Sequence, residues 1–327
     1  MARIVLGIGT SHSPLISTPP ELWSEHARFD RELLPLLGKD GQYHPYAELL
    51  AQAGDTFAEQ VALEVFQAKH ERCQTALATL ADAFAAAEPD VAIIVGDDQQ
   101  EQFSDENMPA MCVYWGDTIL NAPRVIPEGV PPSIVASAWA FGTQERLFPV
   151  AADFGKHVIT SLIDDEFDIA HAKKLGKRHG VGHAFSFVYN RIMGGHVPPH
   201  VPILLNTYYP PNQPTPKRCY ALGQAIRRAV EAWPQDVRVA VIGSGGLTHF
   251  VIDEALDQRV LDAMAAHDGE TLCALPRSLM NSGNSEILNW VTAAGVLSDL
   301  QMALLDYVPC YRTPAGTGIA AAFALWS

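Results

Sequence analysis

The sequence has few basic residues. Its 327 residues include 22 lysines and arginines against 37 aspartates and glutamates, which gives a formal net charge of -15. Nucleic-acid-binding proteins normally present a basic face to the phosphates, so this balance argues against that class. An acidic surface otherwise favours solubility and says little about the fold.

Cysteine is also scarce, and long apolar runs are missing. The five cysteines are an odd number without a CxxC pair, which is typical of a reducing compartment where thiols serve as small core residues. No run approaches the roughly 18 apolar residues that can span a membrane. The opening stretch MARIVLGIGTSHSP lacks the basic region and long apolar region of a signal peptide. We therefore expect a cytoplasmic protein that does not bind membranes.

What the sequence does contain is apolar runs alternating with amphipathic patterns. Continuous apolar strands between such helices predict an α/β fold, with a central mostly parallel or mixed sheet flanked by helices. We expect one domain over residues 1–327, with an inserted, irregular N-terminal lobe at about 17–60 and a loop at 121–133, which holds four prolines. The expected strands are 3–9, 91–96, 111–116, 200–209 and 237–246, and the expected helices are 58–87, 219–233, 253–267 and 285–296.

Polar groups follow four of the expected strands. His12 comes just after the first, the stretch DDQQE (97–101) after the second, TYYPPNQP (207–214) after another, and His249 after the last. Open α/β sheets bind ligands at the carboxyl ends of their strands. A polar stretch after one strand is just as well explained by a solvated loop. Four such ends together indicate a site at this edge of the sheet.

Two of these histidines have informative neighbours. His12 lies between two serines, just past a buried strand, where a role as metal ligand or base is as reasonable as a structural one. In GSGGLTHF, three glycines allow a tight turn and a close backbone approach before His249. A phosphate-binding loop is the alternative, but the P-loop lysine and the GxGxxG spacing are absent.

HGVGHAFSF contains His179 and His183, four residues apart. A zinc-binding pair on one helix face is disfavoured because glycines separate them and no HExxH pattern is present. We expect His183 to be buried and functional and His179 to lie at the surface. Glu286 begins an amphipathic pattern, where a glutamate favoured by the helix dipole is a strong structural alternative to a functional one.

Four stretches together resemble a known family. SHSPL, VGHAFSF, GSGGLTH and SEILNWVTAAG occur in the order, and at about the spacing, found in the class III extradiol ring-cleaving dioxygenases of the protocatechuate 4,5-dioxygenase β-subunit type. The likeness runs from residue 4 to the C-terminal CYRTPAGTGIAAAFALW. Within that family, the length and the opening IVLGIGTSHSP are most similar to the single-chain gallate and 3-O-methylgallate dioxygenases.

The resemblance implies a mononuclear Fe(II) held by two histidines and a glutamate, with His12 and Glu286 as ligands. It makes His249 the acid/base near the substrate and His183 a second polar group facing the substrate hydroxyls. The residue types agree with this chemistry. A facial triad leaves open positions for a catecholate and for O2, and histidine titrates near neutral pH.

One position departs from the family. Counted without gaps from PDV, its second iron histidine falls on Gln99, with Asp98 matching the preceding acid. Gln99 could ligate through its amide oxygen, Asp98 or His44 could replace the histidine, or the iron site could be lost. We favour a retained metal, because the other family residues all survive together.

We therefore expect an Fe(II) dioxygenase that opens the ring of a catecholic aromatic acid, of the gallate, 3-O-methylgallate or protocatechuate type, with O2. The alternatives are a catalytically silent interaction subunit or adaptor, and another metal-assisted hydrolase or isomerase on this scaffold. We expect a homodimer. A carboxylated substrate requires a cationic or donor-rich pocket in this acidic chain. The candidate residues are Lys217, Arg218, Tyr311 and Arg312.

Overall fold

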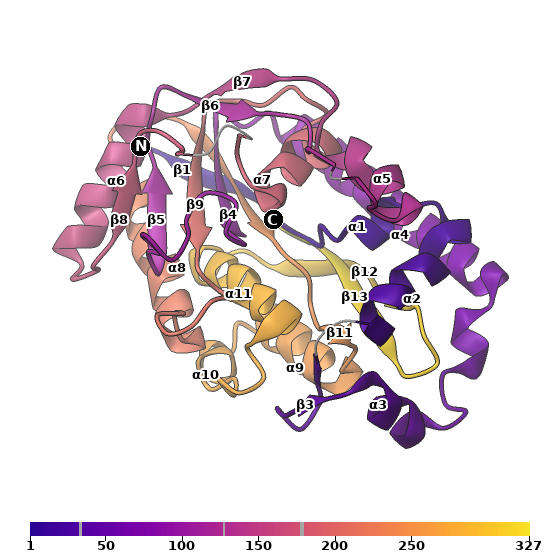
Figure 1. Cartoon of the computed structure of the whole chain (residues 1–327). Coiled ribbons are helices and arrows are strands. Elements are labelled where there is room, and N and C mark those ends of the chain that lie inside the picture. Colours follow the sequence, from indigo (N-terminus) through magenta and orange to yellow (C-terminus); the bar gives the residue numbers. More distant parts are fainter. Residues whose placement is uncertain (33–34, 127, 177–179) are drawn as a thin grey trace.

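The computed structural model describes residues 1–32, 35–126, 128–176 and 180–327. Within them, a mixed sheet has the strand order β11-β13-β1-β10-β4-β9-β5-β8, and β12 pairs with β13 (Figure 1). The prediction of an α/β fold is confirmed. The strands are β1 (Arg3–Thr10), β4 (Val91–Asp97), β5 (Met111–Tyr114), β8 (Ala170–Ala172), β9 (His200–Leu205), β10 (Arg238–Ser244), β11 (His249–Val251), β12 (Met302–Tyr311) and β13 (Thr317–Trp326).

The centre of the sheet is parallel and covered on both faces. β1, β10, β4 and β9 pair in parallel, and every residue of β4 is buried. Ile93 and Val95 face one core, while Ala92 and Ile94 face the other, as the two-residue period of a strand requires. Two buried faces explain why these strands are continuous apolar runs.

Helices form a layer on each side of the sheet (Figure 1). One core receives the apolar faces of five helices, and α11 is buried along its whole length. The other core lies under α4 and α7. The first group is α6 (Ala152–Asp164), α8 (Pro216–Ala232), α9 (Glu254–Ala265), α10 (Gly269–Cys273) and α11 (Ile287–Val296), and the second is α4 (Leu63–Ala87) and α7 (His183–Phe187).

The N-terminal lobe was expected to be irregular, but it consists of short helices and strands. It lies beside β11 and the β12–β13 hairpin (Figure 1). Its apolar residues explain the local order, since Trp23 of α2 is fully buried against Phe66 of α4. The elements are α1 (Pro14–Ser17), η1 (Pro20–Leu22), α2 (Trp23–Glu32), β2 (Leu36–Leu37), β3 (Tyr43–His44), α3 (Tyr46–Ala53) and η2 (Ala58–Val61).

The proline-rich segment is a connection, as predicted. It leaves β6 (Thr118–Asn121), which pairs with β7 (Arg146–Pro149), and ends where α5 (Pro132–Ser137) begins. Its described residues between these elements form no regular structure apart from turns. A proline at the first position of α5 fits the usual place of proline at a helix start.

Two further observations bear on the composition. All five cysteines lie in the described residues, none forms a disulfide, and four are buried. Among the helices of the described residues, none combines the length and the apolar character needed to cross a membrane.

The parallel centre places four strand ends side by side. Thr10 of β1 pairs with Ser244 of β10, and Asp97 of β4 pairs with Leu205 of β9. The segments that follow these residues therefore leave the sheet at the same edge, as the sequence predicted.

Candidate active site

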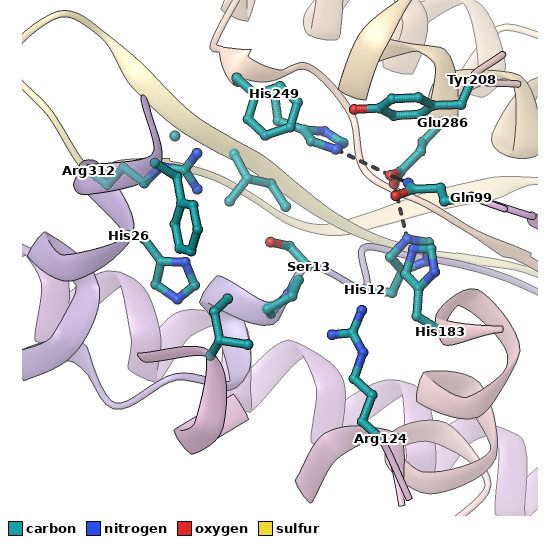
Figure 2. A pocket seen from close by; sticks show the side chains of 16 residues that line it. His12, Ser13, His26, Gln99, Arg124, His183, Tyr208, His249, Glu286 and Arg312 are labelled. Atoms are coloured by element: carbon teal, nitrogen blue, oxygen red, sulfur yellow. Dashed lines mark hydrogen bonds and ion pairs between the residues drawn. The ribbon is translucent and has the colours of Figure 1, made fainter. Parts of the chain in front are cut away.

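A cavity of about 270 Å³ lies at this edge of the sheet (Figure 2). Its walls come from the strand ends, the N-terminal lobe and the start of the segment that carries α11. Six of the residues singled out in the sequence line it: His12, Gln99, His183, His249, Glu286 and Arg312.

His12 turns one ring nitrogen into the site. Its Nδ1 lies 3.0 Å from the hydroxyl of Ser244, which donates its own proton to the carbonyl of Ala184 at 2.7 Å. The hydroxyl must therefore accept from Nδ1–H, and the neutral ring keeps its lone pair on Nε2. That atom is buried without a hydrogen bond, 3.1 Å from Oε2 of Glu286. A lone pair facing a carboxylate is unfavourable, so a metal cation or a proton between the two atoms would stabilise this pair.

His183 and His249 follow the same pattern. Nδ1 of His183 lies 2.9 Å from Oε2 of Glu101, and Nδ1 of His249 lies 2.9 Å from the carbonyl of Leu247. Nε2 of His249 lies 3.3 Å from Oε1 of Glu286, and Nε2 of His183 lies 3.9 Å from Oδ2 of Asp97. All three histidines are thus held at Nδ1 and present Nε2 to two buried carboxylates.

Those carboxylates carry the negative charge of the site. Burial, and then the nearby Glu286, raise the pKa of Asp97. Burial acts the same way on Glu286, but His12 and His249 outweigh it and hold its pKa below the usual value. Buried charges of this kind are normally paired or bound to metal. The ligand atoms of His12, Asp97, His183 and Glu286 lie within 4.8 Å of one another, so these four residues could hold a metal ion.

Gln99 lies inside this group. Its Nε2 donates to Oδ2 of Asp97 at 3.1 Å and to Oε1 of Glu286 at 3.0 Å. Asp98 turns away, because its two oxygens accept from the backbone N–H groups of Gln102 and Phe103. Of the three candidates to replace a histidine ligand, the structure therefore brings Gln99 to the cavity and leaves Asp98 in a turn.

The third candidate, His44, is far less suitable. It lies in the hairpin of the N-terminal lobe, between Asp40 at 3.0 Å and Glu48 at 2.9 Å, and lines a different cavity. Both acids raise its pKa, Asp40 more strongly. His179, expected at the surface, falls outside the described residues.

The other predicted residues fall into two groups. Arg312 reaches the cavity, but one edge of its guanidinium donates two hydrogen bonds to Asp30 of α2, at 2.7 and 2.6 Å. Tyr311 donates to Glu254, Lys217 is exposed, and Arg218 stacks over the ring of Phe167 at 3.9 Å. The structure does not bring these last three to the cavity.

Sequence reasoning did not single out Asp97 as a ligand or Glu101 as a partner of a histidine. A signal was present. Asp97 is the last residue of a buried strand, and the polar residues Gln99 and Glu101 follow it at the edge of the sheet where ligands bind. The structure shows these three at the site and Asp98 on the other side.

Two glycines allow the backbone to pack closely against side chains of the site. A side chain at Gly182 would collide with the carboxylate of Glu101, and one at Gly246 would meet the ring of His249. The backbone N–H of Gly246 also donates to Oε2 of Glu286 at 2.7 Å. Gly182 therefore makes room for the Glu101 carboxylate that holds His183, and Gly246 makes room for the His249 ring itself.

Glu101 should set the charge of His183. Burial lowers the pKa of a histidine, but the Glu101 carboxylate outweighs it and raises the pKa of His183 to about 9. Because the folded pKa lies above the unfolded one of about 6.5, the stabilisation by this pair is complete below about pH 6.5 and is lost as the pH rises through about 9. In the metal-free Glu101→Gln variant we expect a lower His183 pKa in imidazole NMR titrations.

Urea unfolding checks the same pair. Glu101→Gln should destabilise the metal-free protein more at about pH 6 than at about pH 10. The control is Glu106→Gln, an exposed glutamate of the same segment. An equal loss of stability at both pH values would contradict the assignment of charge to His183.

Comparison with known proteins adds a family likeness. Residues 61–323 match the family described as the catalytic LigB subunit of aromatic ring-opening dioxygenase. A gallate dioxygenase of Pseudomonas putida is 31% identical over 192 residues, which are 55% of this chain and 55% of the relative. A 2,3-dihydroxyphenylpropionate/2,3-dihydroxicinnamic acid 1,2-dioxygenase of Comamonas testosteroni is 29% identical over 161 residues, 49% of this chain and 43% of the relative. The chain spans about half the length of the curated relatives it matches.

Among solved structures, an uncharacterized protein of Escherichia coli K12, JW3007, aligns with 77% of this chain and 92% of its own. The TM-score is 0.45 and the identity 10%, which is too weak to bear on function.

Proposed function

The chain belongs to the family of the catalytic LigB subunit of aromatic ring-opening dioxygenase, and from this premise we propose that it opens the ring of a catecholic aromatic acid with O2. The substrate would be of the gallate, 3-O-methylgallate or protocatechuate type. One observation carries the proposal: His12, His183 and His249 all present Nε2 to the buried carboxylates of a cavity.

Fe(II) fits the residues present. The lone pair of His12 Nε2 has no hydrogen bond, and Glu286 lies beside it. Imidazole and carboxylate donors with open positions are typical of non-haem Fe(II) sites. His12 and Glu286 would hold the metal, with Asp97 and His183 within reach. Gln99 would be the third ligand if its amide turned its oxygen inward, since its Nε2 now donates to Glu286. Iron, when bound, supplies the positions at which the diol and O2 meet.

His249 would move the protons. Leu247 holds its Nδ1–H, so Nε2 is free to take a proton from a substrate hydroxyl and to return it later. Burial lowers the pKa of His249, but Glu286 outweighs it and raises the pKa above the ordinary value. His183, kept protonated by Glu101, would donate a hydrogen bond to the second hydroxyl.

Apolar side chains would position the ring. Pro14, Phe29, Phe250 and Ile319 line the cavity beside the polar cluster. They offer flat and aliphatic surfaces to an aromatic substrate and keep water from the groups that transfer protons.

Iron content and oxygen uptake test the proposal. Protein purified anaerobically should hold iron, and gallate, 3-O-methylgallate or protocatechuate should consume O2 and yield a ring-opened acid that carries both atoms of labelled O2. Protein with neither iron nor oxygen uptake would favour a catalytically silent subunit instead. Gln99 is the observation behind that second candidate, because it stands where the family resemblance expects a histidine.

The Gln99 position gives a graded prediction. A neutral amide oxygen gives iron less electron density than imidazole does, so Gln99→His should bind iron at least as tightly as the native chain. Gln99→Ala should lose iron more readily on dialysis, though less readily than His12→Ala. His44→Ala serves as the control and should keep its iron, because His44 lines another cavity.

The opposite result is also informative. Gln99 donates to both Asp97 and Glu286, so if it only bridges the two carboxylates, its removal increases their repulsion. Gln99→Ala would then bind iron as tightly as the native chain or more tightly, and the amide would not be a ligand.

A further inference from the structure

Arg124 is a cation of the cavity without an ion-pair partner among the described residues. Two arginines line the cavity, Arg124 and Arg312. Asp30 binds Arg312 with two hydrogen bonds and neutralises it. Among the residues that the structure describes, no carboxylate oxygen lies within 4.0 Å of the exposed Arg124 guanidinium, although Glu101 is near enough for this charge to help lower the Glu101 pKa. In a chain with a net charge of -15, a cation left without an acid is a candidate for binding an anion.

The side chain is placed to reach a ligand. It leaves the proline-rich connection, packs its guanidinium over the ring of Phe141 at 4.9 Å, and extends into the cavity. Figure 2 shows the guanidinium between Ser13 and the pair formed by His12 and His183. A guanidinium stacked on a ring keeps its N–H groups free at the edge, where a carboxylate can accept two of them.

Ser13 can complete the site. Its oxygen accepts from the backbone N–H of Leu15 at 3.2 Å. Its own O–H has no acceptor among the hydrogen bonds of the described residues, and the residue lines the cavity. An anion bound to Arg124 could therefore accept a further hydrogen bond from Ser13.

The opposite end of the cavity excludes an anion. Asp97 and Glu286 are buried there, and Glu101 lies behind His183. A second carboxylate brought beside them would meet like charges in a poorly solvated space. The diol, which gives up protons, suits that end, so the acid group of the same ring has to point the other way.

We propose that Arg124, assisted by Ser13, binds the carboxylate of the substrate and makes the protein select carboxylated catechols over neutral ones. The inference rests on the proposed ring-opening function and adds the residue that orients the ring. It replaces the expectation that the chain segments around Lys217 or Arg312 supply this cation.

Calorimetric binding to the iron-loaded protein without O2 tests this assignment apart from turnover. Protocatechuate and 4-methylcatechol serve as probes, since they differ mainly in the charged group. The native chain should prefer the acid, and Arg124→Gln should reduce that preference about ten- to a hundredfold, as expected for a hydrogen bond to a charged group. Affinity for 4-methylcatechol should stay the same. Arg124→Glu should weaken protocatechuate further and strengthen the cationic catechol dopamine.

Arg218→Gln is the matched control, because Arg218 stacks on Phe167 outside the cavity. It should bind both probes like the native chain. An unchanged preference for protocatechuate in Arg124→Gln would overturn the assignment, and so would a loss of preference in Arg218→Gln alone. Binding that depends on Arg124 without any ring opening would support the assignment while overturning the proposed function.

Discussion

Replacing His12 or Glu286 by alanine is expected to leave the protein without bound iron. His12 offers a lone pair that makes no hydrogen bond, and Glu286 is a buried carboxylate beside it. Asp97 also reaches this point but already accepts from Gln99 and Asn289, and His183 is kept protonated by Glu101, so we expect neither loss to be compensated. Iron content after anaerobic loading and desalting should fall from about one ion per chain to near none.

Three further variants serve as an intermediate case and as controls for this prediction. Ser244→Ala removes the acceptor that orients His12, and partners of this kind are worth roughly 10- to 100-fold in metal affinity. It should therefore weaken the site without abolishing it. His44→Ala and Lys217→Ala should keep full iron, because neither residue lines the cavity. If both His12→Ala and Glu286→Ala keep full iron and activity, the metal lies elsewhere.

The His249→Ala variant is expected to bind iron and to lose turnover by roughly two to four orders of magnitude, the usual contribution of a positioned acid/base. Its Nε2 lies 3.3 Å from Glu286, within reach of a substrate bound beside that residue. Single-turnover oxygen uptake with protocatechuate measures the loss. Alanine is preferable to phenylalanine, because the backbones of Gly246 and Gly283 pack closely on the His249 ring and leave little room for a larger one.

The iron content of the same variant decides its role. Full iron with slow turnover identifies His249 as the acid/base. Loss of iron would make His249 a ligand, and an unchanged rate would remove it from the chemistry. His183→Ala provides the comparison, because that ring also faces the site but is tied to Glu101.

The ends of the strands could be predicted from the sequence, because the residue types change there. Apolar runs give way to polar residues, and parallel strands bring those residues to one edge, which located His12, Gln99 and His249. The C-terminal hairpin was not apparent, because β13 is rich in alanine, which has little strand preference of its own. Pairing with β1, β11 and β12 makes it a strand.

Charges were harder to place than strands. Arg312 has a suitable sequence context for binding a carboxylate, but its acid comes from a helix 282 residues away along the chain. Lys217 and Arg218 begin a helix that does not line the cavity. Which cation remains unpaired depends on contacts between distant segments, and neither composition nor spacing carries that information.

The bond between Asp30 and Arg312 has a consequence for how this chain can be altered by evolution or by engineering. Asp30 belongs to the N-terminal lobe, is buried, and also accepts the hydroxyl proton of Thr317 on β13. Removing the lobe would remove Asp30 and leave the buried guanidinium of Arg312 without its partner. Breaking a buried ion pair in this way typically costs about 3–5 kcal/mol of stability. The lobe is therefore required for the stability of the cavity wall. A shortened relative would have to change position 312 in the same step, so the length of the N-terminal region and the residue at the cavity wall should vary together.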